Sequence, residues 1–220
     1  MSDTSIDVFI DLPSFPGPVQ AGRLWSHFRK GRESASFEYN KEWLANPHRF
    51  ALEPLLPLAD GTFHTNPGQS VFGAIGDSTP DRWGRILMRR AELARARTAN
   101  ESPHTLSELD YLLRVNDEAR QGALRFSQDG GQSFCAPPGS TPIPPLVNLS
   151  RLLHAADHFC RDDENAEDLR LLLAPGSSLG GARPKASVKD KKGNLCIAKF
   201  PRHDDEYDVV AWEAVALALA

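Results

Sequence analysis

The stretch LLLAPGSSLGGARPKASVKDKKGNLCIAKFP, residues 171–201, decides how the rest of the chain is interpreted. After an apolar run it becomes rich in glycine and serine at residues 176–181, and two short strand patterns follow at 186–188 and 195–200. Glycine has no Cβ, so backbone N–H groups in such a loop can approach the oxygen atoms of a phosphate. The stretch therefore predicts a phosphate-binding loop joined to a β-hairpin.

A lysine and a glutamate accompany this loop. Lys199 lies on the second strand pattern, and apolar residues at helical spacing follow from 206 to 220. Glu213 lies inside that helix, where a partly buried carboxylate needs a cationic partner. Glycine loop, strand lysine and helix glutamate follow one another in the same order in the small lobe of protein kinases. We therefore predict an ion pair between Lys199 and Glu213; the alternative is that both side chains are merely solvated.

The loop by itself admits other interpretations. It is not a Walker A loop, because Ala182 and Arg183 follow Gly181 where that motif needs lysine and then serine or threonine. Ser178 lies in a Gly-x-Ser-x-Gly pattern, which in hydrolases is followed directly by a helix. Pro184 and the strand pattern after it disfavour a helix there. A surface loop without a ligand is the remaining alternative.

Two histidines, His154 and His158, are four residues apart on a helix predicted at 147–160. Zinc is the ligand that such a pair suggests. A metalloprotease helix needs His-Glu-x-x-His, however, and this one has alanine in place of the glutamate. Cys160 lies on a different face of the helix, so the sequence predicts no metal site.

Length and composition limit the possible classes of protein. The chain has 220 residues and a net charge of −4, so no overall basic field favours nucleic-acid binding. Its three cysteines are widely spaced, as expected of reduced thiols rather than a disulfide framework. The N-terminus lacks the pattern of a signal peptide, and no apolar run approaches the roughly 20 residues of a membrane span. We expect a soluble, cytoplasmic protein without membrane contact.

Several motifs resemble one known family. They are SLGGARPK at 178–185 with IAKFP at 197–201 and Glu213, FGAIGDSTPDRWGR at 72–85, and GALRF at 122–126. Together these motifs cover nearly the whole chain, and in their order along it they resemble the HipA family of bacterial serine/threonine kinase toxins. The resemblance implies a type II toxin–antitoxin system in which the toxin phosphorylates a translation factor.

The resemblance also implies roles for individual residues. Ser178 would be the autophosphorylation site, with Ser177 as the alternative, and Glu213 would orient the ATP lysine. The residues implied to bind ATP are Leu179, Gly180, Gly181, Ala182, Lys185 and Lys199. The cofactors would be ATP and Mg²⁺. The catalytic residues and the metal ligands are expected beyond Ala220, so these 220 residues alone are expected to be inactive.

Partners follow from the same resemblance. They are a helix-turn-helix, HipB-like antitoxin and a protein substrate such as a tRNA synthetase, with DNA reached only indirectly through the antitoxin. A different class of function is also implied. In this alternative the chain is a non-catalytic binding or inhibitory module, because it resembles the N-terminal subdomain of the family.

The expected fold is α+β in two parts. Residues 1–140 are expected to form a HipA-like, β-rich N-terminal subdomain with helices, 141–146 a proline-rich linker, and 147–220 the start of an incomplete protein-kinase-like small lobe. Within the first part the patterns predict strands at 7–12, 19–28, 34–39 and 123–126, and a short helix at 41–44.

Two helix starts are predicted from capping signals. Ser78 or Thr79 is expected to cap a helix with Pro80 in its first turn, and Thr105 with Glu108 reads as a capping box. The first of these helices is the most basic element of the chain. Its arginines are Arg82, Arg85, Arg89, Arg90, Arg95 and Arg97. A solvated face with intramolecular carboxylate pairs explains them better than a nucleic-acid interface.

Overall fold

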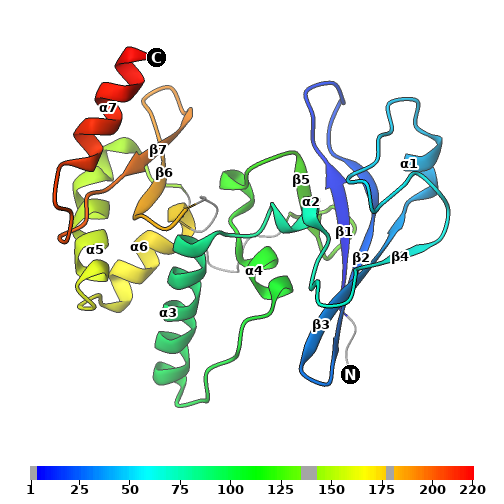
Figure 1. Cartoon of the computed structure of the whole chain (residues 1–220), viewed down its shortest axis with the longest axis horizontal. Helices are drawn as coiled ribbons and strands as arrows, with labels where there is room; N and C mark the ends of the chain where they lie inside the picture. Colours follow the sequence, from blue (N-terminus) through cyan, green and yellow to red (C-terminus); the bar gives the residue numbers. More distant parts are fainter. Residues whose placement is uncertain (1–3, 135–142, 177–180) are drawn as a thin grey trace. The chain divides into compact units, whose positions relative to one another are not determined.

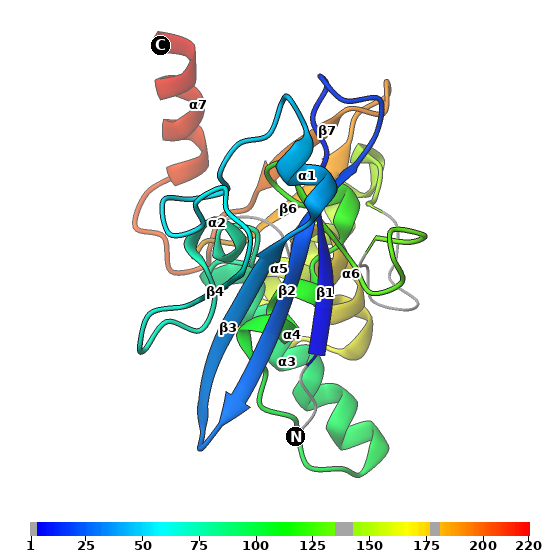
Figure 2. The same ribbon diagram turned by 90° about the vertical axis from the view of Figure 1, so that its right-hand side faces the viewer.

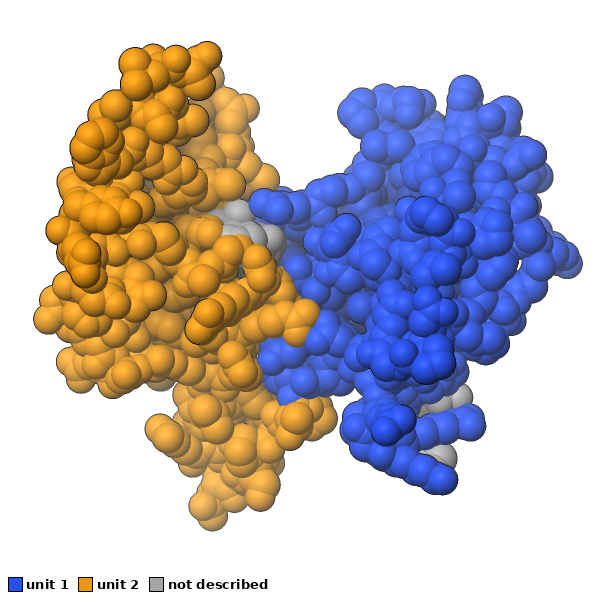
Figure 3. Space-filling model, in the orientation of Figure 1, with its two compact units in different colours: residues 1–79, 106–137 blue, residues 80–105, 138–220 orange. Residues whose placement is uncertain are grey.

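The computed structural model describes residues 4–134, 143–176 and 181–220. The chain forms two compact units, each built from two separate segments (Figure 3). Unit 1 contains residues 1–79 and 106–137, and unit 2 contains residues 80–105 and 138–220. This division differs from the linear one expected at 141–146, because residues 80–105 group with the C-terminal half of the chain.

Unit 1 is organised by a five-stranded antiparallel sheet in the order β4-β3-β2-β1-β5 (Figures 1 and 2). The strands are β1 (Thr4–Ile10), β2 (Val19–Arg29), β3 (Arg32–Tyr39), β4 (Thr62–His64) and β5 (Leu124–Ser127). The four strands predicted for this part of the chain are thereby confirmed, with shifted ends. Lys30 and Gly31 join β2 to β3 with φ of 51° and 74°, the left-handed pair that suits a two-residue hairpin turn.

The core of unit 1 forms where short helices meet the sheet. The helices are α1 (Lys41–Ala45), α2 (Gly73–Gly76) and α4 (Glu108–Arg114), and a 3₁₀ turn covers Asp117–Ala119. Trp43 of α1 is fully buried, and Phe72 and Ile75 are buried in the same core. Large apolar side chains of this kind supply most of the free energy that holds such a layer on a sheet.

Unit 2 combines helices with a two-stranded sheet. Its elements are α3 (Arg82–Ala99), a 3₁₀ turn (Leu146–Asn148), α5 (Leu149–Cys160), α6 (Ala166–Gly176), β6 (Lys185–Lys189), β7 (Leu195–Lys199) and α7 (Val209–Leu219). The strands β6 and β7 pair antiparallel, as the sequence predicted. Side chains from α3, α5 and α6 pack with Ala186 and Val188 of β6 in one core. The hairpin is therefore held by helices on its buried face.

Both predicted helix caps were wrong by a few residues. Asp81 rather than Ser78 or Thr79 caps α3, since the Asp81 carboxylate accepts the N–H of Arg82 at 2.8 Å. The capping box belongs to Ser107 and Asp110, with hydrogen bonds of 3.1 Å and 2.8 Å.

A residue distant in sequence also contributes to the start of α4. The carboxylate of Glu33 accepts the N–H of Glu108 at 2.8 Å. It satisfies a backbone donor at the start of α4, where the helix leaves such groups without a partner in the helix.

The arginine-rich face of α3 makes ion pairs within unit 2. Arg90 contacts Glu164 at 2.8 Å and Asp162 at 2.5 Å, and Arg95 contacts Glu92 and Glu101, each at 2.8 Å. The predicted carboxylate pairs are thus present on this helix. In the described parts of the chain, no helix combines the length and the apolar character needed to cross a membrane.

Gly22 offers a test of the sheet in unit 1. A Cβ at this position would lie 2.3 Å from the backbone oxygen of Glu38 and 2.5 Å from the ring of Phe37, and a paired backbone oxygen cannot move aside cheaply. We expect Gly22→Ala to lower the free energy of unfolding by about 2–4 kcal/mol. Urea unfolding followed by tryptophan fluorescence measures this value.

Gly17→Ala is the matched control, because a Cβ at Gly17 would have no neighbour within 4 Å. Equal stability of the two variants would show that the close approach of β2 and β3 at Gly22 is not required.

Candidate nucleotide-binding site

The register of the β6–β7 hairpin brings two lysines together. Lys185 at the start of β6 pairs directly with Lys199 at the end of β7. Residues directly opposite each other on antiparallel strands project from the same face, and like charges in such a pair are destabilising. Two ammonium groups on one face therefore repel each other, and a bound anion would offset this repulsion.

Lys199 forms the ion pair that the sequence predicted. Its ammonium group contacts the carboxylate of Glu213 on α7. Both side chains are partly exposed, 46% for Lys199 and 38% for Glu213. The helix that carries Glu213 begins at an N-cap, Asp208, whose carboxylate accepts the N–H of Ala211 at 2.9 Å. The structure thus shows the predicted contact, whereas its role toward a nucleotide stays a prediction.

The surroundings of Lys185 disfavour its charged form. Burial is the largest cause that lowers the pKa of this lysine, and the neighbouring Lys199 ammonium lowers the pKa further. The carboxylates of Asp81 and Glu213 act in the opposite direction. A bound polyphosphate would add negative charge, which favours the charged form of the lysine.

Gly181 lies directly beneath the end of the Lys185 side chain. A Cβ on Gly181 would come within 2.7 Å of Lys185 Nζ, and the φ of Gly181 is +85°. Only glycine combines that backbone conformation with the space that the ammonium group needs. Ala182 is exposed. Ser177, Ser178, Leu179 and Gly180 lie outside the described residues, so their predicted roles stay predictions.

Two residues that the sequence analysis did not assign to the site hold Gly181 and Lys185. Gly181 N–H donates to Asp81 Oδ2 at 2.6 Å, and the Gly181 carbonyl accepts the N–H of Trp83 at 3.0 Å. Trp83 Nε1 donates to the carbonyl of Lys185 at 2.9 Å. These hydrogen bonds connect positions about 100 residues apart, which no local pattern could reveal.

The charge of Asp81 is fixed by the same contacts. The hydrogen bond from Gly181 N–H is the largest cause that lowers the pKa of the Asp81 carboxyl, followed by the bond from Arg82 N–H. The group is therefore ionised at neutral pH. Its hydrogen bond also engages the N–H of Gly181, a residue that the sequence analysis assigned to ATP binding.

Residues after the site are held by a second set of contacts. Arg183 forms an ion pair with Asp205, and the same carboxylate accepts the N–H of Arg202 at 2.9 Å. Phe200 N–H donates to the carbonyl of Pro184 at 3.0 Å. The hairpin ladder is thereby extended beyond the two lysines.

The histidine pair on α5 has a partner that the sequence did not indicate. His158 Nδ1 lies 3.0 Å from Asp168 Oδ2, and the ring centroids of His154 and His158 are 4.0 Å apart. Asp168 also accepts the N–H of Asn165 at 3.1 Å. Among residues 4–134, 143–176 and 181–220, no group of three or more histidine, cysteine or acidic side chains suits a metal ion.

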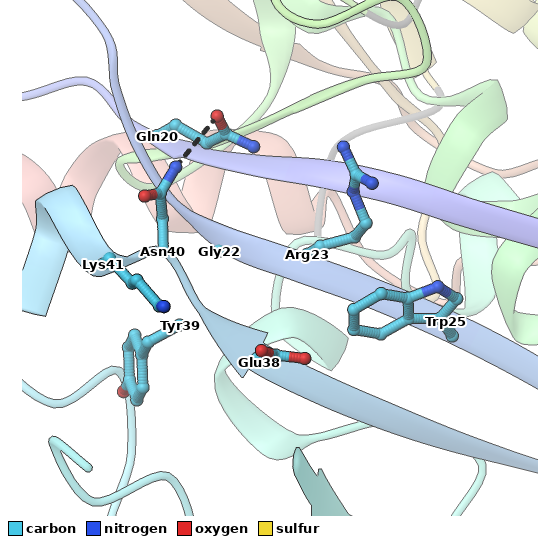
Figure 4. A pocket seen from close by; sticks show the side chains of 8 residues that line it. All are labelled: Gln20, Gly22, Arg23, Trp25, Glu38, Tyr39, Asn40 and Lys41. Carbon is cyan, nitrogen blue, oxygen red and sulfur yellow. Dashed lines mark hydrogen bonds between the residues drawn. The ribbon is translucent and has the colours of Figure 1, made fainter. Parts of the chain in front are cut away.

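Unit 1 contains a separate pocket of about 370 Å³ on the β2–β3 face (Figure 4). It is lined by Gln20, Gly22, Arg23, Trp25, Glu38, Tyr39, Asn40 and Lys41. Asn40 Nδ2 donates to Gln20 Oε1 at 3.2 Å across one end. None of the residues predicted to bind a nucleotide lines this pocket, and no sequence motif indicated it.

Comparison with known proteins gives the family. The chain is a two-unit α+β protein with a lysine-rich hairpin, and residues 17–127, half of its length, match the family model described as the HipA N-terminal domain. The chain therefore belongs to the HipA family, of which it contains the N-terminal part. No curated protein matches it. The matched residues include β2 to β5 and α3 but not the β6–β7 hairpin.

The Lys199–Glu213 pair permits a stability prediction. Exposed ion pairs contribute about 0–1 kcal/mol to folding, so we expect Glu213→Gln to change the free energy of unfolding by less than about 1 kcal/mol. Urea unfolding of the variant and of the wild type measures the difference. A larger loss would mean that the pair is a structural contact that holds α7 in place.

Proposed function

We propose that the chain is the N-terminal part of an ATP-dependent serine/threonine protein kinase, the toxin of a type II toxin–antitoxin system. In this proposal β6, β7 and α7 belong to a kinase-like small lobe, and the hairpin binds the phosphates of ATP. The cross-strand pair of Lys185 and Lys199, with Glu213 on Lys199, is the observation that carries the proposal.

The donor groups suit a polyphosphate. Lysine is a compact point charge with three N–H donors. Two lysines on one face of the hairpin would attract the negative charge of a triphosphate. In protein kinases a strand lysine held by a helix glutamate contacts the phosphates of ATP, and Lys199 and Glu213 have the same relation in the chain. Bound ATP with Mg²⁺ would supply the transferable phosphoryl group, while Lys185 and Lys199 would hold and orient it.

Further parts of the proposal rest on membership of the HipA family. They are autophosphorylation at Ser178 or Ser177, phosphorylation of a translation factor such as a tRNA synthetase, and pairing with a HipB-like helix-turn-helix antitoxin. DNA would be reached through that antitoxin. The catalytic base and the Mg²⁺ ligands are not assigned to residues of this chain.

A second candidate function is a non-catalytic binding or inhibitory module. The pocket on β2 and β3 favours it, because it places the indole of Trp25 and the charged groups of Glu38 and Lys41 around one opening (Figure 4). Tryptophan, tyrosine and arginine are enriched among the residues that contribute most to protein–protein binding, and Trp25, Tyr39 and Arg23 all line this pocket. In this alternative, unit 1 would bind a partner protein and the hairpin would bind no nucleotide.

Substitution of Lys199 tests the first proposal. We expect Lys199→Ala to raise the Kd for ATP with Mg²⁺ by about tenfold or more, because a charge-assisted contact to phosphate is lost. Isothermal titration calorimetry on the full chain measures the Kd. Lys191→Ala is the matched control, since Lys191 is an exposed lysine in the turn between β6 and β7.

The outcomes separate the two candidates. Equal ATP affinities for the Lys199 and Lys191 variants would remove Lys199 from the site. A wild-type chain that binds no ATP would favour the second candidate. Trp25→Ala should leave the ATP affinity of the chain unchanged, because Trp25 belongs to unit 1 whereas the hairpin residues belong to unit 2.

A further inference from the structure

The start of α3 holds both ends of the segment Gly181–Lys185. Asp81 Oδ2 accepts the N–H of Gly181, and Trp83 N–H donates to the carbonyl of Gly181. Trp83 Nε1 reaches the carbonyl of Lys185, four residues further along. We call Asp81 and Trp83, with these three hydrogen bonds, the α3 clip.

The α3 clip is attached to a rigid part of unit 2. Trp83 is 2% exposed, and its ring packs edge-on against Phe159 of α5 with the ring centroids 5.0 Å apart. Leu87, one turn further along α3, is buried in the same core. Because these side chains cannot move independently of the core, the backbone atoms that the clip holds are fixed to that core as well.

The clip fixes the part of the loop that positions the Lys185 ammonium group. The Nζ atom of Lys185 lies 2.7 Å from the position that a Cβ on Gly181 would occupy. The clip holds the backbone of both residues. A segment ordered before binding loses less conformational entropy when its ligand arrives.

We propose that Asp81 and Trp83 are positioning residues that pre-organise the loop end and Lys185 for the phosphates of ATP. The inference rests on the proposed function and adds residues of α3 to it. Neither Asp81 nor Trp83 contacts the bound ATP. Asp81 covers the N-terminus of α3, where its carboxylate accepts the N–H of Arg82, so the helix end itself is not offered as the anion site.

Asp81→Asn separates the clip from the helix cap. Asparagine caps a helix about as well as aspartate, but it has one acceptor oxygen, whereas Asp81 uses Oδ1 for Arg82 N–H and Oδ2 for Gly181 N–H. We expect the Kd of the full chain for ATP with Mg²⁺ to rise about five- to tenfold while the thermal midpoint stays unchanged. Asp77→Asn, which removes the same charge from an exposed residue, should change neither.

Trp83→Phe tests the other side of the clip. Phenylalanine keeps an aromatic ring against Phe159 but lacks the Nε1 donor to Lys185. We expect a rise in the Kd for ATP of about three- to fivefold. Trp25→Phe is the control, because Trp25 belongs to unit 1 whereas the hairpin belongs to unit 2.

Amide exchange at Gly181 gives a readout that would not change if the role of Asp81 were limited to capping α3. In a chain labelled with ¹⁵N-glycine, the Gly181 amide should exchange faster with solvent in Asp81→Asn than in the wild type, with no ligand present. Faster exchange together with weaker ATP binding supports the proposal.

Three outcomes overturn it. Unchanged ATP affinity in both clip variants would leave the proposed function standing and remove Asp81 and Trp83 from it. Tighter binding by Asp81→Asn would show that the carboxylate competes with phosphate for the N–H of Gly181. A wild-type chain that binds no ATP would overturn the proposed function, and the inference with it.

Discussion

The repulsion between Lys185 and Lys199 is the constraint on which the arrangement of the hairpin depends. The antiparallel register fixes the two residues opposite each other, and the pKa of Lys185 is lowered first by burial and then by the neighbouring Lys199 ammonium. Glu213 from α7 and Asp81 from α3 reduce this cost from two sides. Both carboxylates are placed by helices, so the electrostatics of the site depend on helix packing rather than on the hairpin alone.

Packing of the buried face of the hairpin stabilises its register despite the repulsion on the charged face. Ala186 and Val188 of β6 are almost fully buried against α3, α5 and α6, whereas Leu195 and Ile197 of β7 are half exposed. Burial of apolar side chains on one strand supplies the free energy that keeps the register. The hairpin can therefore hold two like charges close together without slipping to another pairing.

Local patterns predicted the elements of this site and missed the contacts that connect them. Two short strand patterns were enough to locate β6 and β7, and the order of glycine loop, strand lysine and helix glutamate was enough to predict the contact of Lys199 with Glu213. The hydrogen bonds from Asp81 and Trp83 could not be predicted, because about 100 residues separate the partners and no periodicity links them. Residues distant in sequence also contact the starts of α3 and α4, where Gly181 N–H donates to Asp81 and Glu108 N–H donates to Glu33.

The motif at residues 72–85 contributes to both units, which gives a physical reason for its length. Its first part places Phe72 and Ile75 in the core of unit 1. Its second part begins α3, and Asp81 and Trp83 there hold the ends of the Gly181–Lys185 segment within unit 2. A substitution in the first part would disturb the core of unit 1, and a substitution in the second part would disturb that of unit 2. The two parts of the motif are therefore under independent constraints, although they are adjacent in sequence. The family match at 17–127 ends before the hairpin, yet through α3 it includes the residues that fix the hairpin's first strand.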